Sequence, residues 1–302
     1  MIKNKLQIKS FLPVLVLFSL AFNTLNSQVS EQEKQGLLDI YNQLGGDDWN
    51  TSWNLEKNVS TWRGVQVVDG KVTEINLFNN NLVGVLPESI GQFKNLTTLN
   101  LAFNSITGEL PQALLVLTEL RVLKLEMNRL KGKLPESIEK LEKLEEFSVF
   151  NNFLSGIIPE GIGQLENLKI LNLSSNNLKG HIPNSLGSLR NLESLGLFEN
   201  SLEGTIPTEL GKLSNLKELV LANNRLGGAI PVEFGQLASL KILQIQNNKF
   251  ESFEGLRLIN SRELLAFDHD GGAELKYDFN GPKKDKTRMA DTKFEDDDND
   301  NK

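Results

Sequence analysis

The sequence of 302 residues contains no cysteine and only two histidines, His181 and His269. The absence of cysteine excludes disulfide bonds, thiol nucleophiles, thiolate metal sites and a lipid anchor on an N-terminal cysteine. The two histidines stand far apart along the chain, so we expect no metal site shared between them. No set of candidate acid, base and nucleophile stands out elsewhere. We therefore predict a protein that is not an enzyme and that holds no metal and no cofactor.

Basic charge and long apolar runs are also scarce. The formal net charge is −7, and the lysines and arginines are scattered, which argues against a nucleic-acid partner. One apolar run, residues 11–22, follows Lys3, Lys5 and Lys9 and is short for a membrane span. With the small residue Ser27 for cleavage, it predicts a signal peptide over residues 1–27 and a protein that is secreted or held at the cell surface. An uncleaved membrane anchor is the alternative.

What the sequence does have is a repeat with a period of 24 residues. In seven of the units a glycine stands four residues after an asparagine, and a proline stands three residues after the glycine. The periodic asparagines are Asn80, Asn104, Asn128, Asn152, Asn176, Asn200, Asn224 and Asn248. A fixed period of this size predicts a solenoid, because one unit cannot bury its apolar face alone and does so only against its neighbours.

The unit over residues 168–191 predicts the local structure of every coil. Its leucines alternate with other residues, as in a short strand with one buried face, so Leu171 and Leu173 should point inward and Ser174 outward. Each coil then adds one parallel strand to a growing sheet. Asn176 follows the strand, and its amide can satisfy turn backbone groups, which predicts a buried ladder of such amides. Gly180 supplies backbone freedom at the next bend.

The pattern L-x-x-L-x-L-x-x-N-x-L-x-G-x-I-P-x-x-L-G-x-L resembles the leucine-rich repeat family, in the 24-residue subtype of plant receptor-like ectodomains. The resemblance covers about eight repeats over residues 72–250. It implies an α/β fold, a right-handed horseshoe solenoid with a parallel sheet on its concave face. In most relatives the concave face binds a protein, a peptide or a glycan. No stretch resembles the transmembrane and kinase portions of receptor relatives.

Caps are expected at both ends of the array. Residues 28–71 predict an N-terminal cap with a helix that begins with a capping box, Ser30 and Glu33, and ends at Gly45. Three tryptophans follow as plugs over the first coil, Trp49, Trp53 and Trp62, with an aromatic ligand cage as the alternative. Residues 67–72 predict a hairpin with an Asp-Gly turn. Residues 251–281 predict a C-terminal cap, and residues 282–302 a disordered acidic tail.

Residues 268–272, with the sequence Asp-His-Asp-Gly-Gly, resemble the opening of a calcium loop. The further oxygen ligands and the glutamate that such a loop requires are not present in register. A calcium site is therefore the less favoured interpretation of this stretch.

The outward columns of the sheet contain the candidate ligand-binding residues. Phe78, Phe150 and Phe198 share one column, and Phe103 and Met127 share the next. With strands about 4.8 Å apart, a row of exposed aromatic side chains would mark an interaction surface. The candidate ligand-binding residues are Phe78, Phe103, Lys124, Glu126, Met127, Phe150 and Phe198, with Glu146 and Glu218 as further polar contacts. The alternative is that the aromatic side chains pack on one another as a hydrophobic edge.

These observations predict an exported, non-catalytic binding protein that recognises a protein, peptide or glycan ligand through the concave face. The alternative is a structural spacer protein of the cell surface or matrix. Glycosylation sequons begin at Asn50, Asn58, Asn95 and Asn172. A glycan on Asn172 would lie on the concave face and would argue against ligand binding at that spot.

Overall fold

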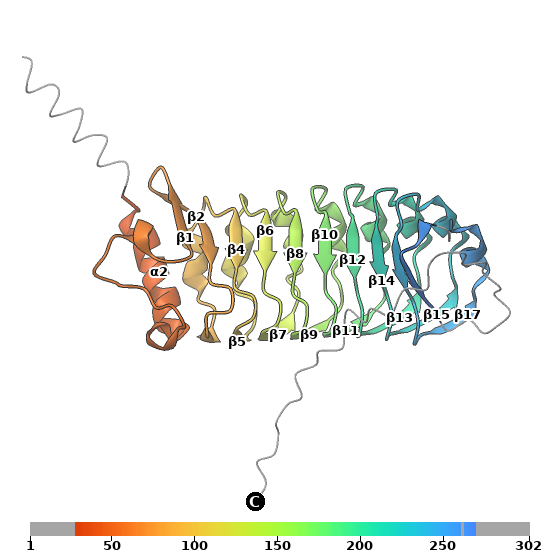
Figure 1. Cartoon of the computed structure of the whole chain (residues 1–302), viewed down its shortest axis with the longest axis horizontal. Helices are drawn as coiled ribbons and strands as arrows, with labels where there is room; N and C mark the ends of the chain where they lie inside the picture. The colour runs from red at the N-terminus through yellow and green to blue at the C-terminus, as the bar shows by residue number, and fades with distance from the viewer. Residues whose placement is uncertain (1–27, 261–262, 270–302) are drawn as a thin grey trace, which may run out of the picture.

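The computed structural model describes residues 28–260 and 263–269. These residues form an elongated array of coils that lie side by side, with helix α2 (Glu31–Gln43) at one end and strand β17 (Lys249–Ser252) near the other (Figure 1). The predicted signal peptide and the predicted acidic tail lie outside the described residues. In the described part, no helix is long and apolar enough to cross a membrane.

The main sheet has ten strands, one for each successive coil after an initial hairpin. The hairpin joins β1 (Val65–Val68) to β2 (Lys71–Asn76) in antiparallel pairing, with Asp69 and Gly70 at positive φ in its turn. The strands that follow are β4 (Thr98–Asn100), β6 (Val122–Lys124), β8 (Glu146–Ser148), β10 (Ile170–Asn172), β12 (Ser194–Gly196), β14 (Glu218–Val220), β16 (Ile242–Gln244) and β18 (Ala266–Asp268). Leu171 pairs with Phe147 of the preceding coil and with Leu195 of the next. Because this offset equals the sequence period, the predicted parallel-sheet solenoid is confirmed.

A second parallel sheet, which was not predicted from the sequence, runs along the lower edge of the array in Figure 1. Its strands are β3 (Val83–Val85), β5 (Ser105–Gly108), β7 (Arg129–Lys133), β9 (Phe153–Gly156), β11 (Asn177–Gly180), β13 (Ser201–Thr205), β15 (Arg225–Ala229) and β17. The repeated glycine therefore belongs to a strand and not to a free bend. Gly180 ends β11 with a φ of 81°, and a Cβ there would lie 3.1 Å from the Ile157 side chain of the preceding coil.

The back of the array consists of short 3-10 helices, which follow the repeated proline except for the last one described, which follows Phe253. Pro87 precedes the first of them in an extended conformation, φ −74° and ψ 152°, which is the backbone that proline favours. The helices are η3 (Glu88–Gln92), η4 (Gln112–Val116), η5 (Ile138–Lys140), η6 (Glu160–Gln164), η7 (Asn184–Ser188), η8 (Thr208–Lys212), η9 (Val232–Gln236) and η10 (Glu254–Leu258). They bury a residue such as Ile90 or Leu186 and close each coil behind the sheets.

One continuous core runs through all coils from Leu37 to Leu256. The predicted asparagine ladder is confirmed inside it. The Asn176 side chain amide donates to the carbonyls of Val149 (2.9 Å), Leu173 (3.2 Å) and Ser174 (3.1 Å), and its Oδ1 accepts from the Leu154 amide at 3.0 Å. Because two of these partners belong to the preceding coil, each asparagine joins two coils as well as supporting its own turn.

The N-terminal cap has the predicted helix, hairpin and tryptophan cluster. The Ser30 hydroxyl accepts from the Glu33 amide at 3.2 Å, and the helix ends before Gly45, whose φ is 70°. The Glu33 carboxylate differs from the expected capping box, because its Oε1 accepts from the Val72 amide at 3.4 Å. The buried Glu33 side chain thus connects the cap helix to the first strand of the array.

The three tryptophans of the cap are buried and pack against one another, Trp53 stacked on Trp62 and edge to face with Trp49. Trp53 lies between Trp49 and Trp62, with ring centroids 4.9 and 4.8 Å away, and Tyr41 stacks on the same cluster. Each indole N–H has a backbone acceptor, as for Trp53 with the carbonyl of Arg63 at 2.8 Å. The cluster is a filled plug with 3–5% exposure for the tryptophans, so it does not form an open aromatic cage for a ligand. Short helices η1 (Gly46–Asp48) and η2 (Val59–Thr61) connect its members.

Packing becomes looser at the C-terminal end. Phe250, Phe253 and Phe267 are only partly buried against the core, and Leu258 and Leu265 are 59% and 60% exposed. Strand β18 still pairs with β16 in register, and the His269 ring lies 4.7 Å from the ring of Phe267. The parallel register therefore persists to this point, whereas the boundaries given to the two caps stay predictions.

Candidate ligand-binding surface

The exposed face of the main sheet is set by the strict register of its strands. From β4 onward the first residues of successive strands form one column and the third residues form another, and Glu74 and Asn76 of β2 continue these columns. The first column reads Glu74, Thr98, Val122, Glu146, Ile170, Ser194, Glu218 and Ile242, and the second reads Asn76, Asn100, Lys124, Ser148, Asn172, Gly196, Val220 and Gln244. The centre of this face is therefore made mostly of polar and small side chains.

The predicted aromatic row lies at the end of the strands and not across the centre of the sheet. Phe103 and Met127 have φ of 58° and 56°, so their column forms a left-handed turn just past the strands. Phe78 and Phe103 are 51% and 44% exposed, and their ring centroids are 5.1 Å apart. Phe150 and Phe198 are half-buried. The exposed part of the row is thus the pair near the N-terminal cap.

The column of Phe78, Phe150 and Phe198 also contains small residues, one of which, Ser174, does not face outward as predicted. Ser174, Ala102 and Ala222 are buried, with 6%, 1% and 0% exposure. Ser174 lies in the coil between those of Phe150 and Phe198, and its hydroxyl accepts from the Phe198 amide at 3.1 Å. A small side chain at this position is covered by the larger residues on either side, so the row is a broken edge and not a continuous aromatic strip.

The structure brings together three of the predicted charged residues. Lys124 Nζ lies 2.8 Å from Glu146 Oε1 on the neighbouring strand, and this hydrogen bond raises the pKa of Lys124. Glu126 lies two residues beyond Lys124, and desolvation raises the pKa of its carboxyl group. Its Oε2 is buried and has no hydrogen-bond partner in the described part of the chain. Glu218 lies elsewhere on the face, where it accepts from the Ser194 hydroxyl at 3.0 Å.

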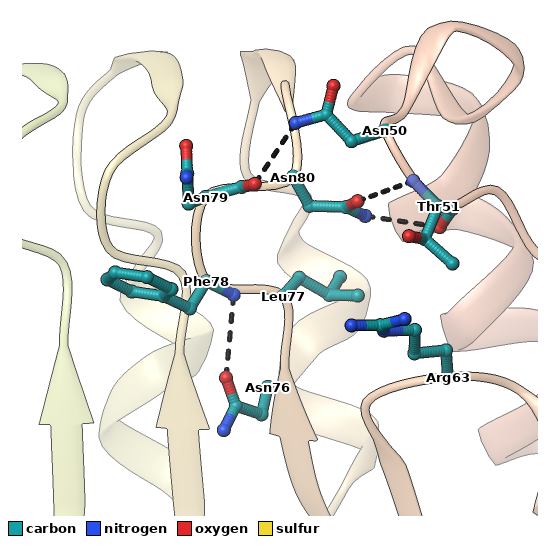
Figure 2. Close-up of a pocket in the computed structure, with 8 residues that line it drawn as sticks. All are labelled: Asn50, Thr51, Arg63, Asn76, Leu77, Phe78, Asn79 and Asn80. Atoms are coloured by element: carbon teal, nitrogen blue, oxygen red, sulfur yellow. Dashed lines mark hydrogen bonds between the residues drawn. The ribbon is translucent and has the colours of Figure 1, made fainter.

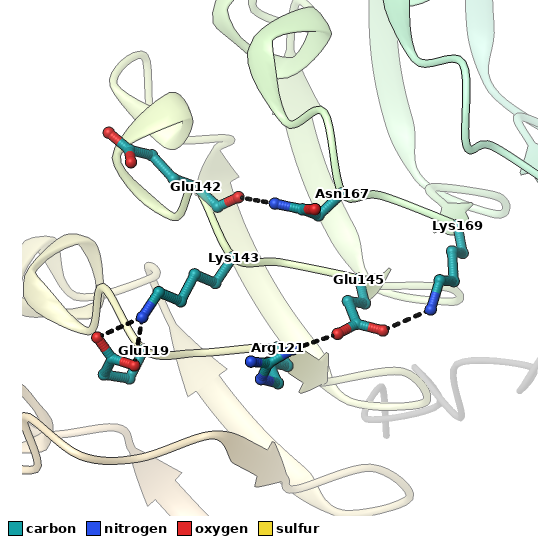
Figure 3. Close-up of polar contacts among 7 residues, drawn as sticks. All are labelled: Glu119, Arg121, Glu142, Lys143, Glu145, Asn167 and Lys169. Atoms are coloured by element: carbon teal, nitrogen blue, oxygen red, sulfur yellow. Dashed lines mark hydrogen bonds and ion pairs between the residues drawn. The ribbon is translucent and has the colours of Figure 1, made fainter.

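A ladder of ion pairs lies just before the strands and was not predicted from the sequence. Glu145 accepts from Arg121 at 2.6 Å and from Lys169 at 2.7 Å, so one carboxylate joins three coils (Figure 3). The hydrogen bonds from Lys169 and Arg121 lower the pKa of Glu145. Lys217 pairs with Glu193 in the same way at 2.6 Å. These charged side chains pair with one another between neighbouring coils, so each of them already has a partner of opposite charge within the chain.

A depression lies where the N-terminal cap meets the first coil, beside the Phe78–Phe103 pair. It has a volume of about 250 Å³ and is lined by Asn50, Thr51, Arg63, Asn76, Leu77, Phe78, Asn79 and Asn80. We call it the cap hollow. In Figure 2, the Arg63 side chain extends from the cap toward Leu77, while Asn50 and Asn79 lie along the opposite rim.

The cap hollow is held in shape by hydrogen bonds between the cap and the first coil. The Asn80 side chain accepts from the Thr51 amide at 2.7 Å and donates to the Thr51 carbonyl at 3.3 Å. Asn50 donates to the Asn79 carbonyl at 3.1 Å. Among residues 28–260 and 263–269, Arg63 forms no ion pair. The hollow was missed in the sequence because its residues come partly from the cap, which lies outside the periodic pattern.

Within the described residues, no three His, Asp or Glu side chains are close enough together to hold a metal ion. His181 is exposed on the second-sheet side, where its Nδ1 lies 3.1 Å from the Glu203 carbonyl, far from His269 in the stack. Residues 270–272 of the stretch that resembles a calcium loop lie outside the described residues.

Comparisons with known proteins agree with the repeat. The protein-family model described as leucine rich repeat matches residues 70–130 and 142–202. A second family model, described as two copies of leucine rich repeats, matches residues 214–258. Together they cover more than half of the chain. A curated relative is the leucine-rich repeat protein FLOR 1 of Arabidopsis thaliana, 32% identical over 93 residues, which are 30% of this chain and 29% of that protein.

Several solved structures with the same architecture are plant receptors. The leucine-rich repeat ectodomain of the receptor kinase GASSHO1/SCHENGEN3 from Arabidopsis thaliana, in complex with CASPARIAN STRIP INTEGRITY FACTOR 2, is 34% identical with a TM-score of 0.73 and covers 78% of this chain. PEPR1–AtPEP1 is 28% identical with a TM-score of 0.72 and covers 80%. The plant peptide hormone receptor RGFR1 in complex with RGF2 is 34% identical with a TM-score of 0.60 and covers 63%. This chain spans 29%, 36% and 30% of those three chains.

Proposed function

Because the chain belongs to the leucine-rich repeat family, we propose that it is an exported, non-catalytic binding protein that takes a protein, peptide or glycan on the concave side of its solenoid. The observation that carries this proposal is the exposed Phe78–Phe103 pair at the border of a polar sheet. Large aromatic side chains left in water favour burial against a partner. The ligand complexes named for GASSHO1/SCHENGEN3 and RGFR1 support the peptide and protein classes.

The predicted ligand-binding residues form the proposed contact region. The exposed pair Phe78 and Phe103 would form its N-terminal part, with Met127 and Phe150 continuing along the strand ends and Phe198 further on. Lys124 and Glu126 would supply polar contacts at the adjoining strands. The proposal places ligand along this border, because the ion-pair ladder already occupies the charges on the opposite border of the sheet.

A double substitution of the exposed pair tests the proposal. Phe78→Ser with Phe103→Asn removes the aromatic surface, and asparagine tolerates the left-handed backbone at position 103. The control is Phe153→Ser, because Phe153 is equally exposed at 43% but lies in strand β9 of the second sheet. We expect partners captured from the native extracellular fluid, identified by mass spectrometry, to be lost with the double variant and kept with the control.

Retention of the same partners by the folded double variant would refute the proposed contact region. Phe150→Asp with Phe198→Asp extends the same test to the half-buried part of the row. The spacer alternative makes a different prediction, because deletion of the residues after Gly281 would then release the protein from the cell surface without changing the captured partners.

A further inference from the structure

We propose that the cap hollow binds the carboxylate-bearing ring of an acidic sugar, a hexuronate unit of a glycan. The inference deepens the proposed function and rests on it, because it names the ligand class at the N-terminal end of the same surface. Three features of the hollow carry it: a cation outside every ion pair of the described chain, unused amide groups, and an adjacent aromatic pair.

The cation is Arg63. Its guanidinium end points into the cap hollow (Figure 2), and the residue forms no ion pair within residues 28–260 and 263–269. The planar guanidinium presents a fork of N–H donors that matches the two oxygens of a carboxylate. In a chain where Arg121 and Lys169 are paired between coils, this arginine is available for an anionic group from outside.

The polar side chains around the hollow can form hydrogen bonds with the hydroxyl groups of a sugar. The Asn79 side chain and the Thr51 hydroxyl take part in no hydrogen bond within the described residues, and Asn50 uses its N–H group on the Asn79 carbonyl while its Oδ1 stays available. An amide carries both donors and an acceptor, and a sugar hydroxyl both donates and accepts. A cluster of such groups around one cation therefore matches a ring that carries several hydroxyls and one carboxylate.

The aromatic pair lies next to the hollow. Phe78 lines it, and the Phe103 ring follows at 5.1 Å. The C–H face of a neighbouring sugar ring can cover these rings and remove apolar surface from water. A glycan with its uronate in the hollow would thus continue along the strand ends toward Met127.

The size of the hollow favours one sugar unit over a bulkier group. Its volume of about 250 Å³ is below the roughly 300–1,000 Å³ of pockets that take drug-sized ligands. A peptide carboxylate would also satisfy Arg63, but a peptide end brings few hydroxyls to the amides of Asn50 and Asn79. The polar lining is the reason that an acidic sugar is favoured here.

Titration calorimetry with defined oligosaccharides tests the inference. The purified chain, made in a bacterial host so that Asn50 carries no glycan, is titrated with a hexuronate trisaccharide and with the same trisaccharide as its neutral methyl ester. We expect the acid to bind at least tenfold more tightly than the ester, and Arg63→Gln to remove about ten- to hundredfold of its affinity, as a charge-assisted bidentate pair predicts. Arg129→Gln, an exposed arginine on the second sheet, is the matched control and should leave affinity unchanged.

The outcomes separate this inference from the proposed function. Equal binding of acid and ester, or equal loss in the Arg63 and Arg129 variants, would overturn the hexuronate site. Binding of a tripeptide with a free C-terminal carboxylate in place of the sugar would overturn it in favour of a peptide. If the Phe78 and Phe103 variants lose a captured partner while no hexuronate binds, the proposed function stands and the inference about the hollow is wrong.

Discussion

The periodic asparagine is the residue on which each coil depends most. Asn176 makes three donor contacts and one acceptor contact with backbone groups of two coils. A backbone polar group that is buried without a partner is costly. This role was predictable from the sequence, because an amide at the same turn position of every coil matches the need to pair the backbone groups of that turn.

Replacing this asparagine should cost far more than replacing its neighbour. Asn176→Ala removes all four contacts and leaves the buried Leu154 amide without this acceptor, so we expect the free energy of unfolding to fall by about 3 kcal/mol or more. Asn177→Ala removes an exposed side chain and should change it by less than about 0.5 kcal/mol. Urea denaturation of the two variants measures both values, and equal losses would contradict the structural role of the ladder.

Glu126 predicts a pH-dependent change in stability. Because desolvation raises its pKa in the folded chain, the fold favours the protonated carboxyl group, and stability is lost as pH rises through the folded pKa. Glu126→Gln, which mimics the protonated form, should therefore stabilise the protein at pH 7, by up to about 1 kcal/mol given the partial exposure. The gain should vanish below about pH 4, where the carboxyl is protonated in both states.

Thermal unfolding from pH 3.5 to 7.5 measures this difference for Glu126→Gln. Glu136→Gln is the control, because Glu136 is exposed at the back of the array and its replacement should not change the unfolding temperature. A gain of Glu126→Gln that is as large at pH 3.5 as at pH 7.5 would show that the carboxyl group is not the cause.

At the scale of the element, the second sheet is the main feature that the sequence did not predict. Its strands contain three to five residues, so the alternation of inward and outward residues has too few members to stand out. In β11 only Leu178 is buried, between exposed Asn177 and Lys179. The main sheet was predictable because two apolar residues in each coil, most often leucines, mark the buried face. The short strands of the second sheet depend on hydrogen bonds between coils, which no local pattern reveals.

The backbone of the second sheet predicts opposite outcomes at two adjacent glycines of β15. Gly228 has a φ of 70°, and a Cβ there would lie 2.9 Å from the Thr205 side chain. Gly227 has no positive φ, and its Cβ would lie 3.4 Å from the nearest atom, the Lys249 carbonyl oxygen. Gly228→Ala should lower the free energy of unfolding by about 1–2 kcal/mol, whereas Gly227→Ala should leave it unchanged or raise it by about 0.4–1 kcal/mol. Guanidinium denaturation distinguishes these results, and destabilisation of equal size would argue against the left-handed requirement.

On the candidate surface, too, the features set by the repeat were predictable and the features set by contacts between coils were not. The columns were correct as columns, since the register follows the 24-residue period. Which members are exposed was not predictable, because exposure depends on the sizes of neighbours one coil away, as for Ser174. The cap hollow could not be predicted from the sequence. Arg63 and Asn79 line the same hollow only because the cap packs against the first coil.

At the scale of the whole molecule, every coil pairs with the next at the same offset of 24 residues. One complete repeat unit can therefore be deleted without disturbing the pairing of the remaining coils. The ladder of Asn176 with Leu154 and Val149 has the same geometry as that of Asn152 with Leu130 and Leu125. Excision of a complete unit therefore joins two coils whose inward and outward positions still match. Excision of one residue fewer would turn inward leucines to the solvent face.

Deletion of residues 168–191 tests this consequence. We expect a folded, cooperative protein whose denaturant m value falls by about a tenth, in proportion to the surface that is exposed on unfolding. Deletion of residues 168–190, one residue shorter, should lose most of the near-ultraviolet circular dichroism signal and the sharp transition. Equal folding of both deletions would contradict the requirement for a fixed phase.

The unequal ends of the array give its unfolding a direction. The first coil is covered by an antiparallel strand and a plug of three tryptophans, whereas the last described coil has half-buried phenylalanines and exposed leucines. Amide hydrogens should therefore exchange soonest in β18, then in β16, and last near β2, because unfolding starts at the C-terminal coil and proceeds toward the cap. A cell that loses this protein to proteases would accumulate fragments that keep the cap hollow, shortened from the far end in steps of one coil.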